Sequence, residues 1–597
     1  MIRMKNLIRT AIAVVLASAA MGSLLAQSSK PNVVFVITDD QGYGDLSVTG
    51  NPILKTPAMD ALHEESVRLT DYHVSPTCAP TRGALMSGHY TNRAGPWHTI
   101  MGRSFLRPEA TTFGEVFGDN GYATGMFGKW HLGDNYPYRP EDRGFQEVVR
   151  HGGGGVGQTP DYWDNSYFDG TYWHNGEPQA YKGYCTDVYF QEATRFMGES
   201  ISRDQPFIAY IAPNAPHSPF HCPDEFWKPY ANKGISDQEA IFFGMIANID
   251  HNLGQLREWL DKKGVADNTI FIFTTDNGSA SGSKVYNSEM RGAKASEYDG
   301  GHRVPFFLHW PEGKLTQPRD VNALTAHIDI LPTLIELCGL NGPMDYSFDG
   351  RSLAPLLYDN PAPWPNRTIV TDSQRVRDPI KWRKSSTMTD KWRLINGEEL
   401  YNMESDPSQK KDVSAQYPEV KQSLRVDYDR WWASISPGFA KETPIVVGND
   451  AENPAHLTSH DWLTNDPLTP WHQNYIRTAR QGDGFWSIRI EKAGTYEIAL
   501  RRWPASLSLP INASLKAGAA VQGLTAFREA KGKSIGATNA VLEIGGHTLE
   551  KKVGRKDEQV SFTVDLKEGM AELHGFFRTE GGEFDILGAY YAVVTRK

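Results

Sequence analysis

Three runs of β-branched and aromatic residues, too apolar for half-exposed strands, do most to limit how this chain can fold. They cover Asn32 to Ile37, Pro206 to Ala212 and Thr269 to Thr275. Such runs are typical of strands that are buried on both faces of a parallel sheet. Segments with apolar residues at helical spacing, such as Glu239 to Lys262, lie between them. The alternation predicts an α/β fold with a large mixed, mostly parallel sheet flanked by helices.

The length of 597 residues exceeds what one hydrophobic core supports, so we expect further structural units. We assign residues 27–370 to a catalytic α/β domain, and the less apolar segment 371–440 to a smaller α+β subdomain. Apolar and polar residues then alternate, for example from Val560 to Leu566. Because this period of two indicates antiparallel strands, we expect residues 441–597 to form a β-sandwich-like domain. That domain could bind carbohydrate or support the rim of an active site.

Residues 1–26 resemble a secretory signal peptide. A basic start precedes the apolar stretch Ala11 to Leu25, which is too short to span a bilayer comfortably. We expect cleavage near Ala26 and a periplasmic or secreted mature protein; a membrane anchor is the alternative interpretation. No later apolar run approaches the roughly 18 residues of a spanning helix, so no membrane span is predicted after signal removal.

Charge and cysteine content exclude two classes of protein. The formal net charge is −10, and an acidic chain is a poor general binder of nucleic acid. An anionic substrate would therefore need local positive charge. Four cysteines in a chain of this length do not make a disulfide scaffold, although one bridge could join Cys185 and Cys222.

Polar pairs follow two of the predicted strands. Asp39 and Asp40 end the first strand, and Asp276 and Asn277 end the third. In open α/β sheets, ligands gather beyond the carboxyl ends of the strands. Four hard oxygen donors suit Ca²⁺ or Mg²⁺ and do not suit zinc. Each pair alone could equally cap a loop or a helix, so the metal site is one of two interpretations at this point.

The segment from Cys78 to Gly88 (CAPTRGALMSG) carries a more specific pattern. It resembles the sulfatase signature C-x-P-S-R-x-x-x-L-T-G and keeps its Cys, Pro and Arg. It departs from the signature at Thr81, Met86 and Ser87. Taken alone, the pattern could also be a buried structural cysteine followed by a turn.

Further matching segments follow in the order found in that family. They are Gly128–Gly133, Ala215–Pro219, Thr275–Gly278, Lys294, Gly300–Pro305 and Leu400–Pro407. From about Pro31 to Val413, the chain is similar to the type I, formylglycine-dependent sulfatases of the alkaline phosphatase superfamily.

The resemblance implies that Cys78 is oxidised to formylglycine by a formylglycine-generating or an anaerobic sulfatase-maturing enzyme. It also implies a Ca²⁺ site, with Mg²⁺ as the less favoured ion. The implied metal ligands are an oxygen of residue 78 and the side chains of Asp39, Asp40, Asp276 and Asn277. The aldehyde would hydrate to a geminal diol, and Asp276 would accept a proton from the hydroxyl that attacks sulfur.

Five further residues have roles implied by the resemblance. His217 would protonate the leaving oxygen, and His131 would help the second hydroxyl to expel sulfate. Lys129 and Lys294 would bind sulfate oxygens, so that both lysines and His217 contact the substrate, and Arg82 would orient residue 78. If Lys129 and His131 lie on an extended segment, both face the same side.

Several loop residues could select the substrate because they lie near the motifs in sequence. They are Trp97, His98, Arg103, His151, Tyr162, Trp163, Tyr298 and His302. The run Gly152 to Gly155 is interpreted as a flexible loop and not as a phosphate-binding loop, because no strand-to-helix pattern with a lysine follows it.

These features predict a sulfuric ester hydrolase that removes sulfate from a sulfated polysaccharide or oligosaccharide. Three alternatives stay open. The chain could be an arylsulfatase of small aryl sulfates, or a phosphodiester or phosphonate ester hydrolase of the same superfamily. It could also be a non-catalytic glycan-binding relative, although the intact Cys78, Lys129 and His217 argue against that interpretation.

Overall fold

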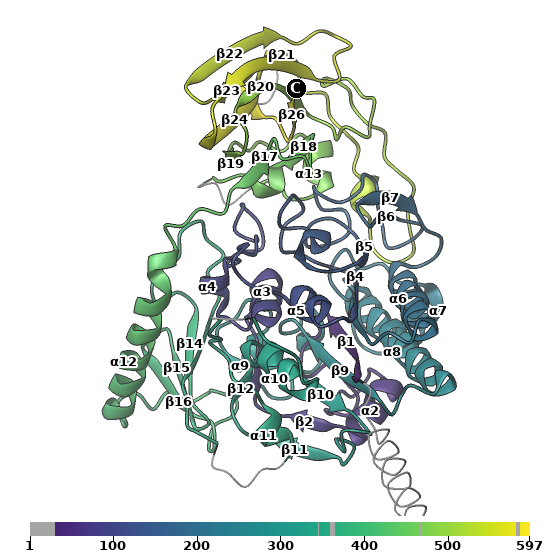
Figure 1. Cartoon of the computed structure of the whole chain (residues 1–597), viewed down its shortest axis with the longest axis vertical. Helices are drawn as coiled ribbons and strands as arrows, with labels where there is room; N and C mark the ends of the chain where they lie inside the picture. The colour runs from purple at the N-terminus through teal and green to yellow at the C-terminus, as the bar shows by residue number, and fades with distance from the viewer. Residues whose placement is uncertain (1–29, 344–345, 359–363, 465–468, 581–584) are drawn as a thin grey trace, which may run out of the picture.

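The computed structural model describes residues 30–343, 346–358, 364–464, 469–580 and 585–597. Figure 1 shows an α/β body, a smaller unit that carries the long helix α12 (Pro418–Ile435) along one side, and a β-rich unit at the C-terminal end. The predicted signal peptide, residues 1–26, lies outside the described residues. Within the described ranges, no helix has both the length and the hydropathy of a membrane span.

The described part of the chain contains a ten-stranded central sheet. Its strands are β1 Asn32–Thr38, β2 Val67–Leu69, β4 Ala123–Gly128, β5 Glu147–Arg150, β6 Thr171–His174, β7 Glu177–Ala180, β8 Phe207–Ala212, β9 Thr269–Thr275, β10 Phe306–His309 and β11 Arg319–Val321. They lie in the order β11-β2-β10-β9-β1-β8-β4-β5-β6-β7. Strands β5, β4, β8, β1 and β9 are parallel, whereas β10 runs antiparallel to β9. The predicted mixed, mostly parallel sheet is thus confirmed.

Helices cover both faces of this sheet. On one face lie α2 Pro57–Glu64, α6 Cys185–Ser202 and α8 Asp237–Lys263, and on the other α3 Cys78–Ser87, α5 Phe113–Asp119 and α10 Ile330–Leu337. Val34 and Val36 of β1 belong to the first core, whereas Val33, Phe35 and Ile37 belong to the second. Because successive side chains of β1 enter cores on opposite faces of the sheet, the strand is apolar at each of these positions.

Helix α8 has sequence-encoded caps at both ends. The Ser236 hydroxyl accepts a hydrogen bond from the Glu239 amide in a capping box, and Gly264 ends the helix in the left-handed conformation. The observed helix contains the whole of the predicted segment, Glu239 to Lys262. The remaining short helices are α4 Thr91–Ala94, α7 Asp224–Trp227, α9 Asp299–His302, α11 Ala354–Leu357 and α13 Gln473–Arg477, and the 3-10 turns are η1 Pro140–Arg143, η2 Lys228–Tyr230, η3 Gly282–Lys284, η4 His327–Asp329, η5 Ser436–Gly438, η6 Ser459–Asp461 and η7 Phe527–Glu529.

The smaller unit is an antiparallel sheet backed by α12. Its strands are β13 Ile369–Asp372, β14 Ser385–Met388, β15 Trp392–Ile395 and β16 Glu399–Asn402, in sequential order. Helix α12 packs Tyr428, Trp431 and Ile435 against Val370. A separate parallel pair joins β3 Tyr72–His73 to β12 Thr325–Ala326.

The C-terminal unit consists of two sheets around one core. The strands are β17 Ile445–Val447, β18 Ala455–Thr458, β19 Phe485–Ile490, β20 Gly494–Arg501, β21 Ala537–Ile544, β22 His547–Lys552, β23 Val560–Leu566, β24 Gly569–Thr579, β25 Ile586–Gly588 and β26 Tyr591–Arg596. One sheet has the order β17-β19-β24-β21-β22, with β25 beside β24, and the other has the order β18-β26-β20-β23. Leu542 of the first sheet and Phe562 of the second share one apolar cluster, as in a sandwich. The boundaries 27–370, 371–440 and 441–597 remain predictions.

All four cysteines lie in the described part of the chain, and all are buried and free. The bridge that could have joined Cys185 and Cys222 is therefore not formed in this structure.

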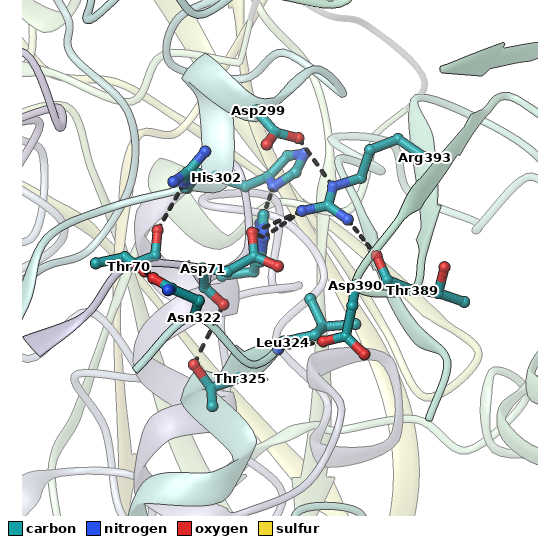
Figure 2. Close-up of polar contacts among 12 residues, drawn as sticks. Thr70, Asp71, Asp299, His302, Asn322, Leu324, Thr325, Thr389, Asp390 and Arg393 are labelled. Carbon is teal, nitrogen blue, oxygen red and sulfur yellow. Dashed lines mark hydrogen bonds and ion pairs between the residues drawn. The ribbon is translucent and has the colours of Figure 1, made fainter. Parts of the chain in front are cut away.

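A buried ionic network joins the smaller unit to the α/β body (Figure 2). Arg393 of β15 donates hydrogen bonds to Asp71 Oδ1 at 2.7 Å and to Asp299 Oδ1 at 3.2 Å. Beside them, His73 Nδ1 lies 2.8 Å from His302 Nδ1. Asp299 begins α9, shortly after Lys294, so the network fixes the segment that follows this lysine.

We expect Arg393→Met to lower the free energy of unfolding by about 3–5 kcal/mol, because two buried carboxylates would lose their cation. Urea denaturation of the full chain measures this change. The control is Arg430→Met, since the Arg430 side chain is 75% exposed in its pair with Asp427, and we expect it to change stability by less than about 0.5 kcal/mol. Equal stabilities of the two variants would contradict the structural role of Arg393.

Candidate active site

Four neighbouring parallel strands bring the candidate residues to one edge of the sheet. Strands β1 and β9 pair with Thr38 opposite Thr275, so Asp39 and Asp276 follow at the same level. Strand β8 lies on the other side of β1 and leads to His217, and β4 lies beside β8 and leads directly to Lys129. The polar strand ends predicted from sequence therefore meet, as expected for the carboxyl edge of an α/β sheet.

A compact group of potential metal ligands lies at this edge. Oxygens of Asp39, Asp40 and Asp276 and the sulfur of Cys78 all lie within 4.8 Å of one another. The Asp40 amide donates to Asp276 Oδ1 at 3.2 Å, and Asn277 Nδ2 donates to Asp40 Oδ1 at 2.8 Å. Asp40 has a φ of 70°, in the left-handed region, where a non-glycine residue is strained.

Each of the three carboxylates has a basic partner. Lys129 Nζ lies 2.6 Å from Asp39 Oδ2, and both side chains are fully buried. Lys294 Nζ lies 2.7 Å from Asp40 Oδ2. This acidic chain thus has the concentrated positive charge that binding of an anion requires.

Arg82 is the third basic partner. Its Nε and Nη2 donate to Asp276 Oδ2 at 3.0 and 2.9 Å, and its Nη1 donates to the Lys129 carbonyl at 2.9 Å. From the sequence, we expected Arg82 to orient residue 78. These hydrogen bonds place its guanidinium on the carboxylate and backbone next to residue 78, so it acts on the surroundings of that residue.

The donor set fits a hard divalent cation. Among the described residues, Asp39 Oδ1 and Asn277 Oδ1 are buried and have no hydrogen-bond partner, which is costly for an oxygen atom. Burial raises the pKa of Asp39 to about 8 despite Lys129, and Asp276 and Asp40 add to the rise. Burial also acts to raise the pKa of Asp40, but Lys294, His217 and Lys129 together lower it below its ordinary range. Calcium prefers such oxygen ligands.

Cys78 is the first residue of α3 and is buried. Burial and the neighbouring Asp39 raise the pKa of its thiol to about 12, even though Lys129 and Lys294 oppose the rise. At neutral pH the side chain is therefore a thiol, and a thiol is a weak nucleophile.

His131 presents one free nitrogen. Its Nε2 lies 2.8 Å from the Thr99 carbonyl, which can only accept, so the proton is on Nε2. Within the described chain its Nδ1 is buried and has no partner, and burial, together with Lys129, lowers the pKa of the ring well below its ordinary value. The condition under which Lys129 and His131 would face the same side, an extended segment, is not met, because His131 has a φ of 63°.

His217 lies on the other side of the carboxylates. Its Nδ1 lies 2.6 Å from the Ser218 carbonyl and therefore carries a proton, and its Nε2 lies 3.8 Å from Asp40 Oδ2. Burial and the charge of Lys294 lower the pKa of His217 to about 3.

Four of the eight loop residues considered for substrate selection have structural contacts instead. Trp97 Nε1 donates to the carbonyls of the 376–377 turn, and Arg103 pairs with Glu442. Trp163 packs edge-on against Trp503, and His302 is fully buried in the network of Figure 2. Their proximity in sequence was misleading, since their side chains point into packed interfaces.

The other four are His98, His151, Tyr162 and Tyr298. Tyr298 donates to Glu399 at 2.8 Å. His151 keeps a buried Nε2 without a partner among the described residues, and the charges of Lys129 and Arg82 act on it. His151 therefore still fits a role at the site.

Sequence reasoning missed the residues that hold the histidines. The Thr99 carbonyl binds His131, and a Cβ at Gly154 would lie 2.2 Å from Cε1 of that ring. His460, from the C-terminal unit, has its ring centroid 6.3 Å from that of His131. A backbone carbonyl, a glycine and a residue more than 300 positions away give no local sequence signal.

Comparisons with known proteins agree with the predicted family and fold. The sulfatase family model matches residues 31–340, and the model of the N-sulphoglucosamine sulphohydrolase C-terminal region matches residues 293–430. Human N-acetylgalactosamine-6-sulfatase is 30% identical over 352 residues, which cover 55% of this chain and 66% of that protein. Klebsiella aerogenes arylsulfatase is 30% identical over 334 residues, which cover 46% of this chain and 71% of that protein.

A solved structure shares the fold of this chain. The structure of Ps i-CgsB in complex with k-i-k-neocarrahexaose is 28% identical, has a TM-score of 0.62, and covers 69% of this chain and 95% of that one. The matches, the fold and the strand-end residues define a sulfuric ester hydrolase with the alkaline phosphatase-like architecture. The chain belongs to the sulfatase family.

We expect Ca²⁺ to raise the melting temperature of the protein, because a ligand that binds the folded state at roughly 100 times its Kd stabilises it by about 2.7 kcal/mol. Thermal unfolding with EDTA and then with added Ca²⁺ measures the shift. The variant Asp39→Asn keeps the shape of the side chain and should lose most of the shift. Asp187→Asn alters a carboxylate of α6 and should keep it. A full Ca²⁺ shift in Asp39→Asn would exclude Asp39 as a ligand.

Proposed function

We propose that this protein removes sulfate groups from a sulfated carbohydrate in the periplasm or outside the cell, using Ca²⁺ and a formylglycine made from Cys78. One observation carries the proposal. The thiol of Cys78 lies within 4.8 Å of oxygens of Asp39, Asp40 and Asp276, and burial, with added effects of Asp39 and Asp276, raises its pKa to about 12. A thiolate is unsuited to that position, whereas an oxygen nucleophile suits both the cation and the reaction.

Formylglycine and Ca²⁺ would together supply the nucleophile. A hydrated aldehyde offers two hydroxyls, and Ca²⁺ makes a bound hydroxyl more acidic. Side chains of the protein would position residue 78 and bind the calcium ion. Asp276, held by Arg82, keeps a carboxylate beside residue 78. Asp39, Asp40 and Asn277 would complete the calcium ligands.

Lys129 and Lys294 would bind the sulfate oxygens. In the structure their ammonium groups neutralise Asp39 and Asp40. Once those carboxylates share a divalent cation, the same ammonium groups can turn to a sulfate oxygen without leaving an unpaired charge buried. Three carboxylates facing Lys129, Lys294, Arg82 and a divalent cation leave a net positive pocket, which favours a monoanionic ester.

The two histidines would move the protons. His217 Nε2 is exposed to the site, and a pKa of about 3 leaves it unprotonated at neutral pH. An arriving sulfate ester adds negative charge beside the ring and so favours the protonated form that can donate to the leaving oxygen. His131, with its proton fixed on Nε2 by the Thr99 carbonyl, would offer Nδ1 as the base that takes the proton of the second hydroxyl, so that the aldehyde re-forms and sulfate leaves the other oxygen.

The carbohydrate assignment rests on relatives. The human relative is named for a sulfated N-acetylgalactosamine, and Ps i-CgsB was solved with a neocarrahexaose. The arylsulfatase of Klebsiella aerogenes supports small aryl sulfates as the second candidate substrate. Periplasmic or secreted location follows from the predicted signal peptide alone.

We expect Cys78→Ala and Cys78→Ser, produced in a host that matures sulfatases, to lower kcat by at least about 10³-fold, because neither side chain offers two hydroxyls on one carbon. Sulfate release from an aryl sulfate and from a sulfated sugar measures kcat. Cys338→Ala alters a free buried cysteine at the C-terminal end of α10 and should keep wild-type kcat. Wild-type turnover in either Cys78 variant would refute the proposed nucleophile.

We also expect kcat/KM to be highest for a sulfated saccharide, lower for an aryl sulfate, and lowest for the matching phosphate diester. The reason is that remote contacts to sugar contribute binding energy that a small aryl group lacks. Parallel kinetics on the three substrates test the order. Faster turnover of the phosphate diester would instead favour the phosphodiesterase alternative, and the absence of turnover on all three would favour a glycan-binding relative.

A further inference from the structure

We propose that the C-terminal β domain, residues 445–597, is a working part of the active site, because it holds the two loops between which His131 lies. The proposal rests on the proposed function, in which His131 is the base that releases sulfate. It goes further by assigning a positioning role to Gln473 and His460, which lie outside both segments that match family models. Four steps lead to it.

The first loop, residues 97–103, fixes the His131 ring from one side. The Thr99 carbonyl accepts the hydrogen bond from His131 Nε2. Two residues later, the Met101 amide donates to the His460 carbonyl at 2.8 Å. A Cβ at Gly102 would lie 3.0 Å from the Asp461 carbonyl, so the loop rests directly on η6 of the β domain.

The second loop, residues 152–161, covers the histidines from the other side. Gly154 lies flat against the His131 ring, where a Cβ would approach within 2.2 Å of Cε1. A Cβ at Gly155 would lie 3.4 Å from His217 Nδ1. This glycine-rich loop therefore sets the space available to both rings, and a shift of its backbone would move them.

Gln473 of the β domain holds the second loop. Its amide donates to the Gly157 carbonyl at 3.0 Å. Its buried Nε2 donates to the carbonyls of Gln158, Asp161 and Tyr162 at 3.1, 3.2 and 3.2 Å. One side chain thus binds two carbonyls of the loop and the carbonyl of Tyr162 directly after it. The Thr159 amide adds a further bond to the Trp471 carbonyl at 2.9 Å.

His460 brings a side chain of the β domain beside His131. The two ring centroids lie 6.3 Å apart, and His460 Nδ1 lies 2.8 Å from Asp461 Oδ1. Its Nε2 is buried and has no partner within the described ranges. The ring therefore packs beside His131, and by our proposal it helps to keep His131 in contact with the Thr99 carbonyl.

The two loops reach His131 from different parts of the α/β body, and among the hydrogen bonds of the described residues none joins one loop to the other. The β domain contacts both. A base that takes a proton in the transition state must be placed to within a fraction of an ångström, and a misplacement of about 1 Å can cost roughly 10²-fold in rate. The geometry therefore makes the β domain necessary for turnover.

Two point variants of the full chain test the proposal. Gln473→Ala removes four side-chain hydrogen bonds, two to the 152–161 loop and two to Tyr162 and Asp164 directly after it. His460→Ala removes the ring but keeps the carbonyl that binds Met101. We expect each to lower kcat by roughly ten- to hundred-fold while KM changes by less than about three-fold, because Lys129 and Lys294 are untouched. Amide hydrogen exchange should become faster in residues 152–161 of Gln473→Ala.

The matched controls are Gln559→Ala and His547→Ala, exposed residues of the same domain, which should keep wild-type kcat and exchange. Aldehyde content at residue 78 and thermal unfolding show that each variant is matured and folded; if Gln473→Ala is not folded, His460→Ala decides. Wild-type kcat in the folded variants, or slow exchange of the 152–161 loop in Gln473→Ala, would overturn the proposal. An inactive wild-type protein would refute the proposed function, while the exchange measurement would still test whether Gln473 holds the loop.

Discussion

Three carboxylates buried at one sheet edge determine most of this structure. Asp39, Asp40 and Asp276 have almost no contact with solvent, and each would be costly to bury without a cation. Lys129, Lys294 and Arg82 supply that charge. The same opposition of charges prepares a site that can hold a divalent ion and an oxyanion together, so the stability of the edge and its chemistry have one origin.

The sheet makes this concentration of charge feasible. Parallel strands that are covered on both faces end at the same level, and β4, β8, β1 and β9 each deliver one or two polar residues there. The α/β body also needs support from outside. Arg393 of the smaller unit fixes the segment after Lys294, and the β domain fixes the loops around His131. The chemistry thus draws on all three units of the chain.

Much of this was predictable, for a physical reason. Buried strands need continuous apolar runs, so β1, β8 and β9 could be located to within one residue, and the polar residues after them had to meet. The Cys78 segment added the family, which the comparisons confirm. The left-handed backbone at His131 was not predictable, because a left-handed residue other than glycine leaves no trace in composition.

Contacts made through the backbone could not be predicted at all. The Thr99 carbonyl that fixes the His131 proton, and the loop carbonyls gathered by Gln473, depend on tertiary placement and not on side-chain identity. Trp163 and His302 show the converse, since residues that are close to the motifs in sequence turn into packed interfaces. Sequence proximity predicts strand ends well and loop contacts poorly.

The central claim is that catalysis needs an oxygen nucleophile at position 78, because burial and the neighbouring carboxylates disfavour the thiolate. The most direct measurement compares preparations that differ in the fraction of chains with an aldehyde at residue 78, quantified by peptide mass spectrometry, and plots specific activity against that fraction. We predict a straight line through the origin. Substantial turnover in a preparation that contains only the thiol would contradict the account.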